Sequence, residues 1–283
     1  MTQPPPVSLA RTEAHPLYSP QVEADFHLWI GHPIAGWAGP SPLPARVLYV
    51  LDADLCFGTA LEMTRLMHQL YGELPPILVV GVAYGGGDPQ RQAQLRNRDF
   101  TPTSMAQYEQ MIGAGATPLL PEGRRMGCAA QFLEFLRQDV RPFVEQRFEV
   151  SAKDSILFGS SLGGLFAMWA FLSAPESFAN YLAVSPALWW DEGMLFALEE
   201  ASNAARADLD AGLFLAVGAL EEDPRLATLL PFKMVSNVTS MAERLAGRAF
   251  SSLRLGSEII AGESHTSVIP AALTRGLRKL SRR

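Results

Sequence analysis

The feature of the sequence that most constrains the fold is an uncharged run from Ser155 to Pro175. At 21 residues, this run is long enough to cross a bilayer as a helix. A cluster rich in glycine and serine interrupts it at positions 159–164, with strand-forming residues before the cluster and helix-forming residues after it. We therefore expect a buried strand, a sharp turn and a buried helix in a soluble protein without a membrane span.

Short apolar segments alternate with segments of helical periodicity through most of the chain. The expected strands are 24–32, 46–52, 76–84, 156–158, 181–184, 213–217 and 252–260, and the expected helices are 60–71, 127–148, 162–172, 192–205, 227–246 and 271–280. Elements that alternate in this way form a mostly parallel sheet with helices on both faces. The sequence thus predicts an α/β fold.

The first 45 residues differ in composition from the rest. Nine of the 21 prolines lie within residues 1–45, which disfavours helices there. We expect residues 1–20 to form a loose arm and 24–32 to form an edge strand. Residues 46–283 contain no internal repeat and no linker, so we predict one α/β domain there and count the whole chain as a single domain. Within it, 85–123 is a polar segment longer than an ordinary connection.

Composition excludes several classes of function. The chain has 23 Lys and Arg against 29 Asp and Glu, a net charge of −6, so no basic surplus is available for binding nucleic acid. Two cysteines, Cys56 and Cys128, cannot form a disulfide scaffold. The chain starts without a basic and apolar leader, which favours a cytoplasmic location. Neither a phosphate-binding loop nor an HExxH motif occurs, so we expect no cofactor and no metal.

The glycine-rich cluster has the pattern of a nucleophile elbow. Residues 159–163 read Gly-Ser-Ser-Leu-Gly and fit G-x-S-x-G between a predicted strand and a predicted helix. Ser161 would lie at the apex of the turn with its hydroxyl exposed above the sheet. The amide of Leu162, at the start of the helix, would donate to an oxyanion. The alternative interpretation is a glycine-rich turn without chemistry.

A nucleophilic serine needs a general base and an acid that orients it, and this arrangement places both later in the chain. His265 is the only histidine after Ser161, and it lies in a loop between the last strand and the last helix. The turn after the predicted strand 213–217 offers the carboxylates of Glu221 and Asp223. We choose Glu221 first and Asp223 second, and a serine–histidine dyad without an acid stays open.

Segments around these residues resemble those of one family. Leu48–Asp54 resembles its Y-x-L-D-[GA]-x segment, Arg96–Pro102 its R-x-x-D-[YLF]-T-P segment, Gly159–Gly164 its G-[HS]-S-L-G-G motif and Val184–Asp191 its S-P-S-x-W-W segment, while Gly218–Glu221 and Gly262–His265 resemble its acid and histidine loops. Over most of residues 46–268 the chain is therefore similar to α/β-hydrolases of the enterobactin (enterochelin) esterase group and related siderophore esterases. Ala187 departs from the pattern, because the family often has serine there.

The resemblance implies an α/β-hydrolase fold and roles for further residues. A backbone amide of Ala53 or Asp54 would be the second oxyanion donor. Arg96 and Arg98 would hold an anionic or catecholate substrate, unless they only form an ion pair with Asp99 that fixes the loop.

Trp189 and Trp190 would line an acyl or aromatic pocket, unless they are ordinary packing residues. The combined prediction is a serine carboxyl-ester hydrolase that forms an acyl-enzyme and needs no metal. Its partner would be a small-molecule ester, such as a siderophore trilactone, with no nucleic acid and no membrane involved. An acyltransferase with the same site and a non-catalytic ligand-binding protein are the alternatives, and the oligomeric state stays open.

Overall fold

The sheet at the centre of the fold contains eight strands in the order β1-β2-β4-β3-β5-β6-β7-β8. The computed structural model describes residues 8–281 except 38, 40–43, 85–87, 107, 109–125, 205, 227 and 228. The strands are β1 (Thr12–Ser19), β2 (Ala24–Gly31), β3 (Ala45–Val50), β4 (Ile77–Ala83), β5 (Val150–Ser160), β6 (Asn180–Val184), β7 (Gly212–Gly218) and β8 (Arg254–Ile260). The helices are α1 (Ala53–Gln69), α2 (Pro89–Asp99), α4 (Ala129–Phe135), η2 (Leu136–Val140), α5 (Arg141–Arg147), α6 (Leu162–Ser173), η3 (Pro175–Ser177), α7 (Trp190–Ala204), η4 (Ala219–Glu222), η5 (Leu230–Phe232), α8 (Met234–Gly247) and α9 (Val268–Ser281).

The strands from β4 across to β8 pair in parallel, and β1 and β2 are antiparallel to their neighbours. Every residue of β3, β4, β6 and β7 is buried. Strands read as continuous apolar runs when both faces of a parallel sheet are covered. The predicted α/β fold with a mostly parallel sheet is confirmed.

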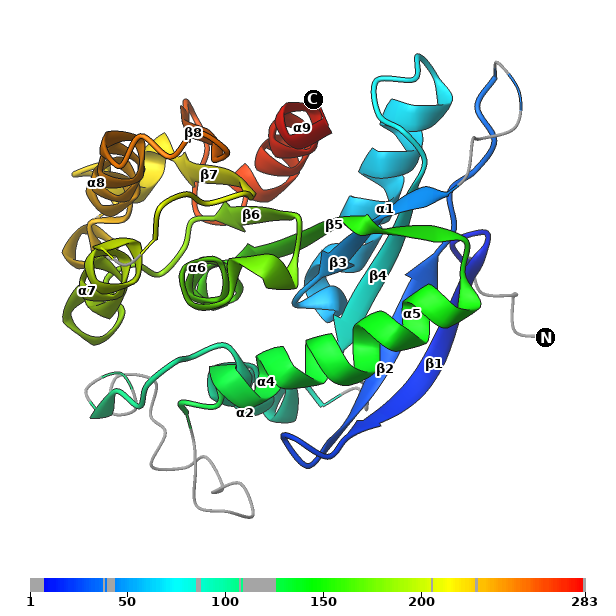
Figure 1. The fold of residues 1–283 in the computed structure, drawn as a ribbon, viewed down its shortest axis with the longest axis horizontal. Helices are drawn as coiled ribbons and strands as arrows, with labels where there is room; N and C mark the ends of the chain where they lie inside the picture. Colours follow the sequence, from blue (N-terminus) through cyan, green and yellow to red (C-terminus); the bar gives the residue numbers. More distant parts are fainter. Residues whose placement is uncertain are drawn as a thin grey trace.

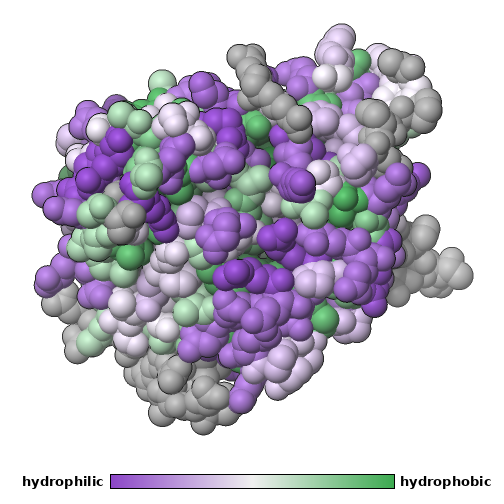
Figure 2. Space-filling view, in the orientation of Figure 1, coloured by the Kyte–Doolittle hydropathy of each residue, from purple (hydrophilic) through white to green (hydrophobic). Residues whose placement is uncertain are grey.

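Helices cover both faces of the sheet (Figure 1). One apolar core lies between the sheet and helices α1 and α9. The other core lies between the opposite face and helices that include α4, α6 and α8. Figure 2 shows polar side chains over most of one face of the molecule, with hydrophobic residues scattered among them. The two cores hold the strands rigidly, so the ends of neighbouring strands can position a site.

The predicted loose arm over residues 1–20 is wrong for residues 12–19, which form β1. This strand pairs along its whole length with β2, so β2 is not the edge strand of the sheet. Pro16 is tolerated in β1 because one side of an edge strand needs no ladder donors. The guanidinium of Arg65 in α1 donates to the carbonyl oxygens of Ala10 and His32, and so ties both strands to the helix.

The polar segment 85–123 contains a helix that the sequence pattern did not predict. Helix α2 begins after Asp88, whose carboxylate accepts hydrogen bonds from the amides of Gln90 and Arg91. Pro89 occupies the first helical turn, where its missing N–H costs nothing. Residues 85–87, 107 and 109–123 of this segment lie outside the described residues.

The uncharged run from Ser155 to Pro175 forms the end of β5, the turn at Ser161 and helix α6, as predicted. Almost all of α6 is buried, which explains why it carries no charge. Of the helices in the described ranges, none has the length and apolar character that crossing a membrane requires.

A buried ion pair between α7 and α8 yields a prediction about stability. Glu199 is fully buried and accepts hydrogen bonds from Arg244 at 2.9 Å and Arg248 at 2.8 Å. Glu199→Ala removes the buried acceptor of both arginines, which are themselves about a third exposed and become solvated, so we expect it to lower the free energy of unfolding by about 2 kcal/mol. Urea unfolding at pH 7, followed by tryptophan fluorescence, measures this loss.

The neighbouring Glu200 provides the control. Its side chain is 73% exposed and lies 3.4 Å from Arg244. We expect Glu200→Ala to cost about 1 kcal/mol or less, because exposed ion pairs contribute little. Equal losses in the two variants would contradict the role of Glu199.

Candidate active site

Ser161 lies at the sharp turn between β5 and α6. Its backbone angles are φ 58° and ψ −116°, which are strained for a residue other than glycine. A Cβ atom on Gly159 would lie 2.1 Å from the carbonyl oxygen of Gly163, and one on Gly164 would lie 2.9 Å from that of Val184. The turn therefore requires glycine at both positions, and it places Ser161 at the apex.

The candidate acid and base meet at the same edge of the sheet. Glu221 lies in η4 directly after β7, and His265 lies in the loop between β8 and α9. The Nδ1 atom of His265 is 2.6 Å from Oε2 of Glu221. The Glu221 side chain is fully buried and the His265 side chain is 30% exposed. A carboxylate in this position holds the proton on Nδ1 and leaves Nε2 available as a base.

The loops that carry these two residues are in direct contact. The amide of Leu220 donates to the carbonyl oxygen of Glu263 at 3.0 Å. A Cβ atom on Gly218 would lie 2.4 Å from the same oxygen, so a larger residue would force the loops apart. Glycine at position 218 thus allows the acid loop and the histidine loop to approach.

Asp223, the second candidate acid, faces a different partner. Its carboxylate binds the guanidinium of Arg225, with a shortest distance of 2.6 Å. These hydrogen bonds lower the pKa of Asp223 to about 2. Of the two carboxylates, Glu221 is the one that contacts the imidazole.

Ser161 and His265 line one pocket, with a volume of about 450 Å³. The other lining residues are Asp52, Leu55, Cys56, Thr59, Arg96, Ser160, Thr266, Ile269 and Pro270. One wall comes from the first turns of α1, which were missed because the helix was predicted to begin only at residue 60. No hydrogen bond joins the Ser161 hydroxyl to the imidazole among the described residues, and such contacts are often long before substrate binds.

Two helix N-termini lie near Ser161 and could supply oxyanion donors. Helix α6 begins at Leu162 and helix α1 begins at Ala53. Amides in the first turn of a helix have no acceptor within it, and they attract negative charge. A Cβ atom on Gly163 would lie 3.4 Å from Oδ2 of Asp52, the residue that precedes α1, so the two helix starts are adjacent.

The carboxylate of Asp54 connects α1 to the segment after β4. It accepts hydrogen bonds from the Tyr84 amide and from the Gln92 side chain, both at 3.1 Å. Burial raises the pKa of Asp54. The side chain of Asp54 is therefore committed to these contacts, and only its amide is a candidate oxyanion donor.

Arg96 reaches the pocket from α2. Its Nε donates to Oδ1 of Asp52 at 2.7 Å, and its Nη2 donates to the carbonyl oxygen of Ser160 at 3.3 Å. The nearby Asp52 carboxylate raises the pKa of Arg96, although burial opposes this. Arg96 therefore neutralises the Asp52 carboxylate beside the two helix starts.

Arg98 does not reach the pocket. Its side chain is buried, and Nε donates to Oδ1 of Asp99 at 2.5 Å while Nη1 donates to the carbonyl oxygen of Val22 at 2.8 Å. The ion pair raises the pKa of Arg98 against the effect of burial. In the structure Arg98 therefore makes the loop-fixing ion pair, which was the alternative to substrate binding.

The two adjacent tryptophans also lie outside the residues that line the pocket. Trp190 is fully buried, and its Nε1 donates to Oγ1 of Thr103 at 3.1 Å. Trp189 is half-buried and packs against Phe232, with ring centroids 4.4 Å apart. In the structure both indoles therefore make packing contacts, as in the alternative interpretation of the sequence, and neither lines this pocket.

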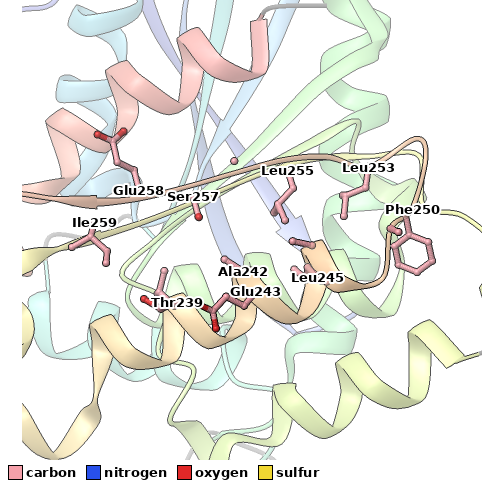
Figure 3. A pocket seen from close by; sticks show the side chains of 14 residues that line it. Thr239, Ala242, Glu243, Leu245, Phe250, Leu253, Leu255, Ser257, Glu258 and Ile259 are labelled. Atoms are coloured by element: carbon pink, nitrogen blue, oxygen red, sulfur yellow. The ribbon is translucent and has the colours of Figure 1, made fainter.

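A second hollow lies between α8 and β8, lined by residues such as Leu245, Phe250 and Leu255 (Figure 3). None of its lining residues belongs to the serine, histidine and carboxylate group. Within the described ranges, no three or more His, Cys, Asp or Glu side chains are grouped so that they could hold a metal ion.

A parallel sheet with a serine at its central strand–helix turn, and a carboxylate and a histidine on later loops, defines an α/β-hydrolase. The crystal structure of the BES protein from Bacillus cereus has the same fold, with a TM-score of 0.80 and 26% identity, covering 100% of this chain and 99% of that one. Siderophore hydrolase EstB from Aspergillus nidulans gives a TM-score of 0.80 and 25% identity, over 98% of this chain and 97% of that one.

Sequence comparison identifies the family. Residues 37–251 match the family model described as "Putative esterase". The chain is 30% identical to ferri-bacillibactin esterase BesA of Bacillus subtilis over 276 residues, 94% of this chain and 88% of that protein. It is 29% identical to siderophore triacetylfusarinine C esterase of Aspergillus fumigatus over 258 residues, 84% of this chain and 82% of that protein. The chain belongs to this esterase family and is a carboxylic ester hydrolase, which confirms the predicted resemblance and enzyme class.

Cys56 also lines the pocket, and we expect its thiol to be unreactive. Burial and the nearby Asp52 carboxylate raise the pKa of the Cys56 thiol to about 12, so it stays protonated at neutral pH. We expect Cys56→Ala to keep kcat/KM for an aryl ester within about 3-fold of the wild type. Iodoacetamide at pH 8 should not inhibit the folded enzyme, and a loss greater than tenfold in Cys56→Ala would contradict this assignment.

Proposed function

We propose that Ser161, His265 and Glu221 form a catalytic triad that hydrolyses a small-molecule ester through an acyl-enzyme. The observation that carries this proposal is the 2.6 Å contact between His265 Nδ1 and Glu221 Oε2, made by a histidine that shares its pocket with Ser161. A buried carboxylate on one imidazole nitrogen prepares the other nitrogen to accept the serine proton.

The proposed reaction has two halves. The Ser161 oxygen attacks the ester carbonyl as its proton passes to Nε2 of His265, and the resulting imidazolium then protonates the departing alcohol. Water enters next and gives a proton to the same nitrogen as it attacks the acyl carbon. The carboxylic acid leaves, and the Ser161 hydroxyl is restored by the proton from His265.

We propose the amides of Leu162 and of Ala53 or Asp54 as the oxyanion hole. These amides lie in the first turns of α6 and α1, whose starts are adjacent at the pocket. Preorganised donors at the position where charge develops lower the barrier more than they stabilise the substrate.

The substrate class that we propose is a siderophore-type ester. Relatives of this chain are named for such substrates: ferri-bacillibactin, triacetylfusarinine C and enterobactin. The pocket offers an apolar wall with Leu55 and Ile269, and one guanidinium, Arg96. An apolar wall beside a planar cation suits the ring and the phenolic oxygens of a catecholate.

The triad assignment predicts the effect of three substitutions. We expect Ser161→Ala and His265→Ala to lower kcat for p-nitrophenyl acetate by about 10⁴-fold or more, and Glu221→Gln by about 10²- to 10⁴-fold. A fluorophosphonate probe should form one adduct, at Ser161, located by peptide mass spectrometry.

Asp223→Asn is the matched control for Glu221→Gln, because both remove one charge from the same loop. It should leave kcat within about 2-fold of the wild type, since Asp223 faces Arg225. A wild type that resists the probe, or Asp223→Asn that loses as much activity as Glu221→Gln, would overturn the triad.

The two proposed effects of Arg96 are separable. Arg96→Met should lower kcat for a neutral ester about tenfold, because the Asp52 carboxylate is then unpaired beside the oxyanion amides. The double variant Asp52→Asn/Arg96→Met should restore kcat to within about 3-fold, because it removes that charge. For a catecholate ester, both variants should have a raised KM, because the guanidinium is absent from each.

Steady-state measurements of kcat and KM with one neutral and one catecholate ester provide this test. An unchanged KM for the catecholate in both variants would exclude Arg96 from substrate binding. A double variant as slow as Arg96→Met with the neutral ester would exclude the charge-neutralising effect.

A further inference from the structure

The serine of the Ser-Pro-Ala-Leu-Trp-Trp segment is fully buried, and no role has yet been assigned to it. Ser185 follows the last residue of β6, and its amide donates to the carbonyl oxygen of Ala216 at 2.7 Å. Its φ of 43° is unusual for a residue other than glycine. A strained backbone with a buried hydroxyl persists only where the surrounding structure holds it in place.

The hydroxyl of Ser185 donates to Oε1 of Glu221 at 2.5 Å. The amide of Gly218 donates to the same oxygen at 2.8 Å, while Oε2 faces Nδ1 of His265. One carboxylate oxygen therefore has two neutral donors and the other has the imidazole. Such an arrangement stabilises the charged carboxylate and allows it one orientation.

The turn that carries Ser185 also contacts the nucleophile. The amide of Ser161 donates to the carbonyl oxygen of Val184 at 3.0 Å, and the amide of Ala187 donates to that of Ser161 at 3.2 Å. The residues directly before and shortly after Ser185 thus hold the Ser161 backbone. A single short turn connects the position of the nucleophile to that of the acid.

We propose that Ser185 is a positioning residue of the esterase: its hydroxyl holds the Glu221 carboxylate in the orientation that binds His265 and stabilises its charge. This inference rests on the triad proposed for Ser161, His265 and Glu221. Ser185 itself touches no reacting atom and acts through Glu221.

The other charged groups near the pair are bound elsewhere. Glu222 accepts hydrogen bonds from Ser236 of α8, Asp223 binds Arg225, and Glu263 accepts one from Ser267. Across the pocket, Asp52, which precedes α1, and Arg96 of α2 form an ion pair that is internally neutral. Removing the Ser185 hydroxyl therefore takes one hydrogen-bond donor from Glu221, while the neighbouring carboxylates of these loops keep their own partners.

Two variants test the role of the hydroxyl. Ser185→Ala and Ser185→Gly both remove it, but glycine accepts the positive φ without strain. Without this donor the Glu221–His265 pair should bind its proton more tightly, so the acid limb of the kcat/KM profile should move up by about one pH unit in both variants. Activity should fall by up to about tenfold at pH values below the wild-type midpoint of the acid limb and stay within about 3-fold well above that midpoint.

Ser155→Ala is the matched control. Ser155 is also a buried serine, at the start of the uncharged run in β5, and its hydroxyl oxygen accepts a hydrogen bond from the amide of Ala179 at 3.2 Å. We expect this variant to lose thermal stability but to keep the midpoint of the acid limb. When Glu221 is already replaced by Gln, adding Ser185→Ala should not shift the acid limb of the kcat/KM profile further, because Ser185 acts through the Glu221 carboxylate.

The titration of the His265 imidazole, followed by NMR against pH, tests the inference without turnover. Its midpoint should rise by about one pH unit in Ser185→Ala and Ser185→Gly. Midpoints unchanged by both NMR and kinetics, or an equal shift in Ser155→Ala, would overturn the role of Ser185. A wild type without esterase activity or a Ser161 adduct would instead overturn the triad, and the NMR comparison would still decide whether Ser185 acts on the Glu221–His265 pair.

Discussion

The rest of the site depends on the close approach of two glycines in the turn between β5 and α6. A Cβ atom on Gly159 would lie only 2.1 Å from the carbonyl oxygen of Gly163, so no side chain fits at position 159. The close approach goes together with the strained backbone of Ser161, and it places the start of α6 directly beside Ser161. The strain is borne by the core, because β5 and α6 are almost entirely buried around the turn. The strained backbone of Ser161 and the adjacent start of α6 thus share one packing constraint.

The register of the sheet positions the partners of Ser161. In the parallel ladder between β7 and β8, Gly218 lies opposite Ile260, so both strands end at the same level. The acid loop and the histidine loop leave the sheet side by side, and the contact between them needs the glycine at position 218. Residues 44 apart in the chain are therefore brought into a 2.6 Å contact by backbone geometry. The short turn at Ser185 adds the third connection, from β6 to the same carboxylate.

The sequence predicts the strands and helices that are apolar along their whole length or on one face. It misses elements such as β1 and α2, whose formation depends on pairing or capping by neighbouring residues. The central strands were predicted because they are apolar along their whole length. Strand β1 was missed because Pro16 and a mixed pattern hide an edge strand that its pairing with β2 defines. Helix α2 was missed because it is mostly polar, although Asp88 followed by Pro89 is a helix-start signal. The sequence ranked Glu221 before Asp223, and their tertiary hydrogen bonds show that Glu221 contacts the imidazole while Asp223 binds Arg225.

Arg96 and Arg98 show why residue type alone does not establish contact with a substrate. From the sequence, both were candidates either for binding it or for an ion pair with Asp99, since an arginine in an irregular segment has no defined direction. In a helix, however, residues two apart point about 200° away from each other, so one pocket cannot receive both. The structure accordingly places Arg96 at the pocket with Asp52 and buries Arg98 with Asp99. Which helix face an arginine of α2 occupies therefore decides whether its guanidinium lies at the pocket near Ser161 or packs in the scaffold. This face follows from the helical geometry of α2 and cannot be read from the motif.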